Sequence, residues 1–307
     1  MDLKRGYDIL VVTGPTASGK TSLAATVAKE LKGEIISADS RQIYRGMNLG
    51  TGKDFDDYII AGIAIPCHLI DIADPGYKYN VFEYQRDFIR VYNLLKGRNV
   101  FPVVCGGSGM YVDSIISGYR MREVPPDPEL RSGLEEKSME ELIRILSDYK
   151  DLHNTSDIDT RKRAIRAIEI GIFTRKQPVE PDSFPDLNPL VVGVLPGRDL
   201  RRKKISERLL KRLDDGMIDE VKQLLNSGVD EETLIYYGLE YKFITLFLTG
   251  RLTYDEMVRD LEIAIHQFAK RQMTWFRGME RRGVKINWID AELPMDVKVD
   301  KVMALLI

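Results

Sequence analysis

The chain has 307 residues, 44% hydrophobic and 30% charged, an ordinary balance for a globular protein with room for about two domains. Its 45 basic and 47 acidic residues give a formal net charge of −2, which excludes a uniformly basic nucleic-acid-binding surface but leaves local basic patches open. Two cysteines and three scattered histidines argue against a disulfide scaffold and a zinc site, and without a signal-peptide pattern or a long apolar run we expect a cytoplasmic protein with no membrane contact.

Short apolar runs alternate with helical patterns along most of the chain. Buried-strand patterns occupy residues 8–13, 34–38 and 99–105, and helical patterns follow at 21–31 and from 110 onward. Another strand pattern lies at 190–195 and a last one at 284–289, with helical patterns between them at 199–225 and on to about 282. This alternation predicts a parallel α/β sheet with helical crossovers.

The middle of the chain has a different character. It opens with three prolines at 125, 126 and 128 and closes with Pro178, Pro181, Pro185 and Pro189, and helical patterns lie between them at 129–136, 139–146 and 161–173. We therefore predict two domains. The core comprises residues 1–121 and 190–307, with a helical C-terminal part, and residues 122–189 form a helical insertion.

The segment between the first strand and the first helix carries a complete phosphate-binding motif. GPTASGKT at residues 14–21 fits the P-loop pattern G-x-x-x-x-G-K-[ST], in which glycines let backbone N–H groups face phosphate oxygens at a helix N-terminus. We expect the phosphates of a pyrophosphate or a nucleotide to contact Gly14, Pro15, Thr16, Ala17, Ser18, Gly19, Lys20 and Thr21, with Thr21 also coordinating Mg²⁺. The predicted fold is an α/β fold of the P-loop NTPase type. By itself the loop favours ATP or GTP and a kinase.

Two polar side chains follow other predicted strands. Asp39 ends the second strand, where ligands of open α/β sheets bind, so it is a candidate metal ligand or general base; the alternative is an Asx-turn. Ser108 follows the third strand and is a candidate substrate contact; the alternative is a helix N-cap, and one hydroxyl can serve both roles.

Several motifs occur together in one order along the chain. GPTASGKT (14–21), ADSRQIYRGMNLGTGK (38–53), HLID (68–71), GGSGMYVDSIISGY (106–119), PPDPELR (125–131), DTRKRAIRAIEI (159–170) and FAKRQMTWFR (268–277) resemble the tRNA dimethylallyltransferase family. The matches cover almost the whole chain, and their joint occurrence is specific. The resemblance implies transfer of a dimethylallyl group from dimethylallyl diphosphate to N6 of adenosine 37, next to the anticodon of a tRNA.

The resemblance also implies roles for individual residues. Asp39 is implied to be the general base, Ser108 stands where the family usually has threonine, and Lys20 stabilises the leaving diphosphate together with Mg²⁺ and arginines. Arg198 and Arg208 best match the family's diphosphate-binding arginines. The residues implied to contact the tRNA anticodon stem-loop are Asp39, Ser40, Arg41, Gln42, Ser108, Arg131, Arg161, Lys162, Arg163, Lys270, Arg271, Gln272, Trp275 and Arg277.

Basic clusters on helical patterns fit phosphate contacts with base stacking, although such clusters are also typical of solvated helix faces. The chain also departs from the family at other positions. Glu240 replaces a usual glycine, and Ile265-His266 replace threonine and arginine. Three other functions stay open from the motifs alone: prenyl transfer to free adenine nucleotides, small-molecule kinase activity, and RNA binding without chemistry. We expect a monomer.

Overall fold

The computed structural model describes residues 6–119, 121–150, 157–177 and 184–306, so Pro178 and Pro181, which close the predicted insertion, lie outside the described residues. The chain divides into two compact units. Unit 1 comprises residues 1–119 and 185–307, and unit 2 comprises residues 120–184. The prediction from sequence placed these boundaries at 122 and 189.

Unit 1 is built on a six-stranded sheet in the order β5-β2-β6-β1-β7-β8, with every neighbouring pair parallel. The strands are β1 (Ile9–Thr13), β2 (Glu34–Ser37), β5 (Cys67–His68), β6 (Pro102–Gly106), β7 (Pro189–Leu195) and β8 (Ile286–Asp290). The predicted parallel α/β sheet is therefore confirmed. The third strand starts three residues later than predicted because Asn99 turns with a left-handed φ of 54° and Pro102 opens the strand.

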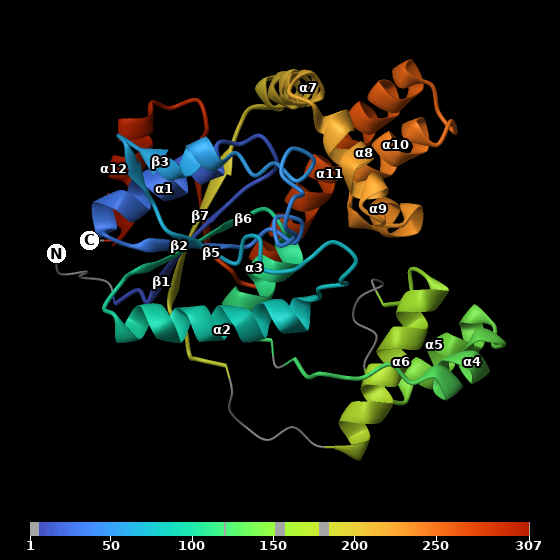
Figure 1. Ribbon diagram of the computed structural model, residues 1–307. Helices are drawn as coiled ribbons and strands as arrows, with labels where there is room; N and C mark the ends of the chain where they lie inside the picture. The colour runs from blue at the N-terminus through green and yellow to red at the C-terminus, as the bar shows by residue number, and fades with distance from the viewer. Residues whose placement is uncertain (1–5, 120, 151–156, 178–183, 307) are drawn as a thin grey trace. The chain divides into compact units, whose positions relative to one another are not determined.

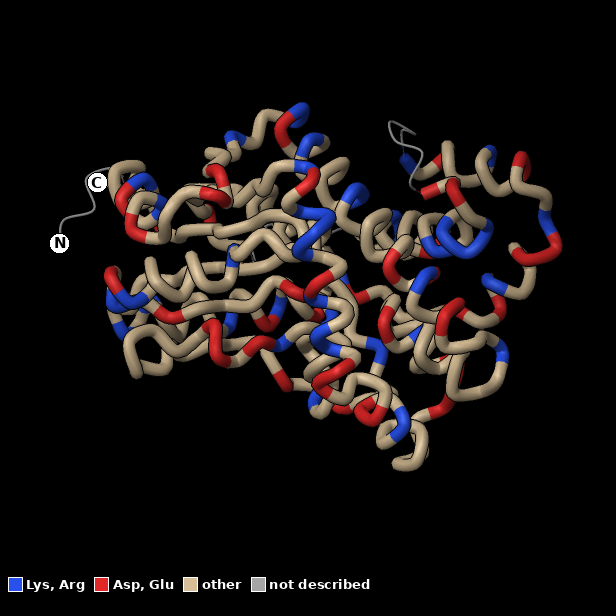
Figure 2. The backbone as a smooth tube through the Cα atoms, turned by 90° about the horizontal axis from the view of Figure 1, so that it is seen from above, with Lys and Arg blue, Asp and Glu red and all other residues tan. Residues whose placement is uncertain are grey.

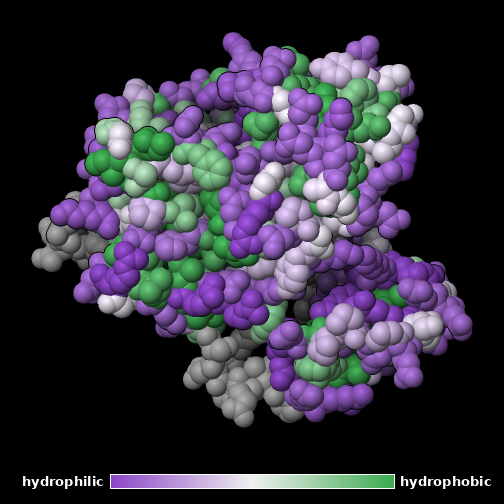
Figure 3. Space-filling model, viewed as in Figure 1, coloured by the Kyte–Doolittle hydropathy of each residue, from purple (hydrophilic) through white to green (hydrophobic). Residues whose placement is uncertain are grey.

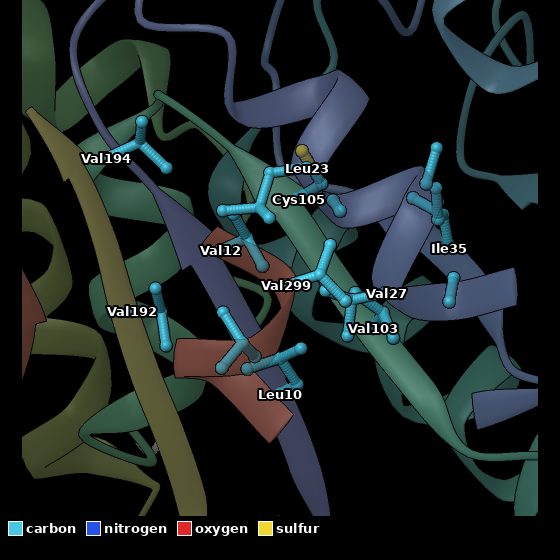
Figure 4. Packing of buried hydrophobic residues seen from close by; sticks show 14 of the residues in the cluster. Leu10, Val12, Leu23, Val27, Ile35, Val103, Cys105, Val192, Val194 and Val299 are labelled. Atoms are coloured by element: carbon cyan, nitrogen blue, oxygen red, sulfur yellow. The ribbon is translucent and has the colours of Figure 1, made fainter. Parts of the chain in front are cut away.

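Helices cover both faces of this sheet (Figure 1). Helices α1 (Lys20–Leu31) and α12 (Met295–Leu306) pack on one face, where Leu10, Val103 and Val192 of the strands meet Val27 and Val299 in a buried core (Figure 4). Helices α2 (Val81–Gly97) and α3 (Gly109–Ile116) lie on the other face. Burial on both faces explains why the strands are continuously apolar.

The helices after β7 form a second core with the loop that follows β2. They are α7 (Arg198–Asp214), α8 (Met217–Asn226), α9 (Glu231–Tyr237), α10 (Leu239–Leu248) and α11 (Tyr254–Arg281). The single helix predicted over 199–225 is wrong: Gly216 has a φ of 98° and separates α7 from α8. The prediction also missed α2, α12, strand β5 and the hairpin of β3 (Ile59–Ile60) and β4 (Ile63–Ala64), although a capping box of Asn80 and Glu83 marks the start of α2.

Unit 2 has a small core of its own. Helices α4 (Pro128–Glu135), α5 (Met139–Ser147) and α6 (Arg161–Lys176) bury Leu134, Leu142 and Ile168 against one another. All three helices match the predicted helical patterns to within three residues.

Charges of both signs are interspersed over the chain (Figure 2), and hydrophilic side chains dominate the face shown in Figure 3. Within the described ranges, no helix is long and apolar enough to cross a membrane.

Candidate active site

A cleft of about 560 Å³ lies at the carboxyl edge of the sheet in unit 1. The loops after β1 and β2 contribute the P-loop and residues 39–42, and the end of β6 with the start of α3 contributes residues 105–111. Helices α7 and α10 contribute Arg208 and Glu240, and α11 contributes five side chains between Ile265 and Trp275. The carboxyl ends of parallel strands are where open α/β sheets bind ligands. The cleft therefore gathers most of the predicted site residues of unit 1.

The P-loop has the backbone shape that phosphate binding requires. Gly14 has a φ of 151°, and a Cβ at this position would lie 2.5 Å from the carbonyl oxygen of Val194. Gly19 is the N-cap of α1 with a φ of 78° and has no side chain to occupy the first amides of the helix. The N-terminal end of α1 is thus open to an anion.

Lys20 lies at the base of the cleft and contacts the loop itself. Its Nζ donates to the carbonyl oxygen of Pro15 over 3.4 Å. Burial lowers the pKa of the Lys20 ammonium, whereas Cys105 and Asp39 oppose that shift. A partly buried ammonium beside open amides is a strong attractor for phosphate oxygens.

Helix α11 fastens the P-loop to the loop after β6. The Gln272 side chain accepts from the Thr16 amide and donates to the Gly107 carbonyl, each over 2.9 Å. Trp275 donates from Nε1 to the buried Asp113 over 3.2 Å, and a Cβ at Gly109 would lie 2.5 Å from its ring. Gln272, predicted to contact tRNA, thus bonds with both ends of its amide inside the fold, while Trp275 also lines the cleft.

Asp39 and Ser108 follow the carboxyl ends of the neighbouring strands β2 and β6. Asp39 Oδ1 accepts from the Arg41 amide over 2.9 Å, which is the bond of an Asx-turn. Ser108 Oγ accepts from the Ser40 amide over 2.9 Å and lies 3.2 Å from Ser40 Oγ. Ser108 occupies the N-cap position of α3, but its side chain makes no capping bond and instead holds the turn that carries Asp39.

Gln42 and Arg41 also line the cleft. Gln42 donates from Nε2 to the Gly52 carbonyl over 3.0 Å, which secures the turn internally. The Arg41 guanidinium lies 5.7 Å from the centre of the exposed Tyr236 ring.

The two predicted diphosphate arginines separate in the structure. Arg208 lines the cleft and donates from Nη2 to Thr16 Oγ1 over 3.1 Å. Burial, together with the neighbouring Arg212, lowers the pKa of Arg208 to about 10. Arg198 begins the same helix ten residues earlier, about 15 Å along the axis, where it is exposed and does not line the cleft. The structure thus brings only Arg208 to the P-loop.

The donors near the P-loop suit a hard divalent cation. Thr21 lines the cleft, and Asp57, which accepts from Ser22 Oγ over 2.8 Å, lines it as well. Hydroxyl, carboxylate and phosphate oxygens are the ligands that Mg²⁺ prefers. Asp57 follows no motif, and its place in the cleft has no sequence signal.

The remaining predicted tRNA contacts fall into two groups. On α11, Lys270, Arg271 and Arg277 are exposed, and Arg271 lines the cleft. In unit 2, Lys162 is exposed, whereas three arginines are bonded within the unit. Arg131 forms a two-bond pair with buried Glu169, Arg161 donates to the Glu135 and Lys137 carbonyls at the end of α4, and Arg163 pairs with Asp159. These bonds do not test contact with tRNA, which stays a prediction for all three arginines.

Two family models match the chain: "IPP transferase" over residues 42–279 and "Isopentenyl transferase" over residues 7–61. A tRNA dimethylallyltransferase 2 of Bacteroides fragilis is 62% identical over 294 residues, with 96% of each chain covered. A tRNA dimethylallyltransferase 2 of Phocaeicola vulgatus is 59% identical over 300 residues, with 98% of each chain covered.

Solved structures agree with these matches. The full-length tRNA isopentenylpyrophosphate transferase of Bacillus halodurans superposes with a TM-score of 0.70 at 30% identity, covering 97% of this chain and 95% of that one. A eukaryotic dimethylallyltransferase described as acting on tRNA has the same fold, with a TM-score of 0.75 at 19% identity over 93% of this chain and 74% of its own.

Proposed function

This chain belongs to the IPP transferase family, whose curated relatives are tRNA dimethylallyltransferases, and we propose that it transfers a dimethylallyl group from dimethylallyl diphosphate to N6 of adenosine 37 of a tRNA. The observation that carries this proposal is the cleft itself. An open P-loop, Arg208 and the carboxylate of Asp39 line one cavity of about 560 Å³, so an anion site and a candidate base face the same space.

In this reaction a bond forms between N6 and the allylic carbon, and the bond from that carbon to the diphosphate oxygen breaks with its electron pair going to the diphosphate. Negative charge grows on the leaving oxygen. Lys20, the amides at the start of α1 and Arg208 stabilise that charge because they are already held in place by the fold.

Asp39 accepts the proton that N6 loses as the new bond forms. An exocyclic amine is a weak nucleophile, so a positioned base in contact with it accelerates the step. Ser108 supports this role by bonding the Ser40 amide, which fixes the turn that presents Asp39.

Thr21 would hold Mg²⁺ with the diphosphate oxygens, and the ion would add positive charge to the leaving group. The exposed cations of α11 and Lys162 of unit 2 would contact the tRNA backbone. We further propose that the protein acts as a monomer in the cytoplasm.

A prenyl-transfer assay tests the proposal. Purified protein with Mg²⁺ and dimethylallyl diphosphate is offered total tRNA and, in parallel, AMP and ATP, and nucleosides are read by mass spectrometry. We expect a dimethylallyl mass gain on adenosine from tRNA alone. A gain on free nucleotides would reassign the acceptor, and ATP consumption without prenyl transfer would overturn the proposal in favour of a kinase.

A further inference from the structure

Glu240 places a carboxylate in a cleft that otherwise suits an anion. It lies in the first turn of α10, directly after the turn at Gly238, and is partly buried. Its side chain lines the cleft together with Asp39 and Arg208. The proposed chemistry gives this carboxylate no part, and the family resemblance has glycine at its position, so its presence needs a physical account.

The neighbours of Glu240 include two arginines, Arg212, which is buried, and Arg208, which is partly buried. Arg208 and Arg212 lie one turn apart on α7 and, with Glu240, line a small void of about 10 Å³ next to the cleft. Arg212 is 5% exposed and donates from Nη2 to both oxygens of Asp54, while its buried Nε has no hydrogen-bond partner among the described residues. Asp54 thus balances Arg212, and Glu240 is the next carboxylate beside Arg208.

Apart from Asp54, which is paired with Arg212, the cleft has more cations than carboxylates. In the described part of the chain the cations that line it are Lys20, Arg41, Arg208 and Arg271, and the remaining carboxylates are Asp39, Asp57 and Glu240. Ionised Glu240 therefore offsets one of these cations. The side chains that α8 and α11 place in the void beside Glu240 are the apolar Met217 and Ile265. Glu220 of α8 is occupied by the Asn48, Leu49 and Gly50 amides and by the Tyr241 hydroxyl.

A bound diphosphate would add negative charge beside this carboxylate. Burial already raises the pKa of Glu240, with Arg212 and Arg208 opposing the shift and Asp39 adding to it. A diphosphate on Arg208 would raise that pKa further, because it places more negative charge near the group and takes over the cation that favours ionisation.

We propose that Glu240 is the internal counter-ion of Arg208, and that a diphosphate replaces it in that role, with Glu240 taking up one proton as the diphosphate binds. The proposal rests on the proposed function insofar as it places the donor diphosphate at the P-loop. It makes donor affinity dependent on pH. At high pH, ionised Glu240 competes with the donor for Arg208. At low pH, Glu240 is neutral and does not compete.

Calorimetry with inorganic pyrophosphate and Mg²⁺ tests this without requiring catalysis. The wild type, Glu240→Gln and the control Glu232→Gln, an exposed glutamate in the first turn of α9, are titrated from pH 5.5 to 8 in two buffers of different ionisation enthalpy. We expect Glu240→Gln to bind on the order of tenfold more tightly than the wild type at pH 8, which corresponds to about 1.4 kcal/mol. The ratio should fall towards one at pH 5.5.

Proton uptake gives the second readout. Protonation of pyrophosphate itself contributes equally in all three proteins, so the difference in proton uptake between wild type and Glu240→Gln reports on Glu240 alone. Glu240→Gln should take up less than the wild type by up to one proton, and Glu232→Gln should match the wild type.

Equal affinity and equal proton uptake in the wild type and Glu240→Gln would overturn the proposal. Weaker binding by Glu240→Gln would also overturn it, because Glu240 would then support Arg208 rather than compete for its ligand. Glu240→Gly provides a second variant if glutamine prevents folding. If none of the proteins binds pyrophosphate, the donor site of the proposed function fails as well, whereas binding without any Glu240 effect refutes this inference alone.

Discussion

At the scale of single residues, the side chains singled out for chemistry are also bonded to the fold. One oxygen of Asp39 accepts from the Arg41 amide and so forms an Asx-turn, and Ser108 accepts from the Ser40 amide of the same turn. The turn and the proposed base role are compatible because a carboxylate has two oxygens that accept independently. This pairing allows a substitution that separates chemistry from backbone structure.

Asp39→Asn tests the general base. The asparagine carbonyl can still accept from the Arg41 amide, but it cannot take a proton from N6. We expect turnover to fall by about 10²–10⁴ while tRNA binding stays close to wild type, measured by single-turnover prenyl transfer and filter binding. Wild-type turnover would show that another group removes the proton.

Ser108 tests the support of that turn. Ser108→Ala leaves the Ser40 amide without its acceptor, which costs roughly 1–3 kcal/mol where the amide is buried, so we expect turnover to fall about tenfold. Ser108→Thr retains a hydroxyl and serves as the matched control. Equal rates for all three proteins would show that the hydroxyl does not position Asp39.

At the scale of elements, helix α11 lies late in the chain but packs against the P-loop, which lies near the start of the chain. Its Gln272 joins the P-loop to the loop after β6, a contact across 256 residues of sequence. Helix α6 plays a similar part inside unit 2, where its buried Glu169 gathers Arg131, Arg166 and the Asp127 amide.

Gln272→Ala tests the role of α11 as a clamp. Loss of both amide bonds frees the Thr16 N–H and the Gly107 carbonyl, so the P-loop should become less ordered. We expect the KM for dimethylallyl diphosphate to rise about five- to twentyfold in steady-state assays, with a smaller change in the KM for tRNA. Gln267→Ala, at an exposed position of the same helix, should behave as wild type. A rise confined to the KM for tRNA would instead make Gln272 a tRNA contact.

Glu169→Gln tests the polar centre of unit 2. The variant leaves Arg131 and Arg166 without a full countercharge, and removing one partner of a buried pair costs roughly 3–5 kcal/mol. Both arginines are more than a third exposed, so we expect a smaller loss of about 1–3 kcal/mol. Hydrogen exchange of the α4–α6 amides measures it against the exposed control Glu140→Gln. Unchanged exchange would mean that water replaces the lost ion pairs.

At the scale of the whole molecule, acid stability follows from buried carboxylates. Glu34 starts β2, is 7% exposed, and binds the His68 ring over 2.7 Å and the Arg98 guanidinium. Burial acts to raise the pKa of Glu34, but the hydrogen bonds from His68 and Arg98 outweigh it, and the pKa lies below the ordinary 4.5. The unfolded chain therefore binds more protons than the native state in this range.

This gives a signed pH dependence. The stabilisation from Glu34 should be fully present above about pH 4.5 and should be lost as the pH falls through its lower native pKa. Urea unfolding followed by tryptophan fluorescence measures it in unit 1, because Trp275 and Trp288 both lie there. Glu34→Gln should be less stable at pH 7 and should decline less between pH 5 and 3. An identical slope in both proteins would contradict the assignment.

Much of the fold was predictable because local patterns encode it. A parallel strand buried on both faces is an apolar run, and an amphipathic helix repeats at 3.6 residues, so β1, β6, β7 and the helices of unit 2 appear in the sequence. Strand β5, two residues long, and helix α12 were missed because short or weakly patterned elements gain their stability from packing.

The sequence by itself determined the P-loop, because glycine, lysine and threonine at fixed spacing suffice to shape a phosphate-binding turn. It also determined the parallel sheet, through the alternation of apolar runs and helical patterns, and the family, through the order of several motifs. Only the tertiary structure decided which side chains from distant parts of the sequence lie beside the phosphate-binding turn. It placed Arg208, Gln272 and Glu240 at the cleft and left Arg198 outside. The reason is physical: the direction in which a helix presents a side chain depends on its packing, and the effect of a charge depends on neighbours that are far away along the chain.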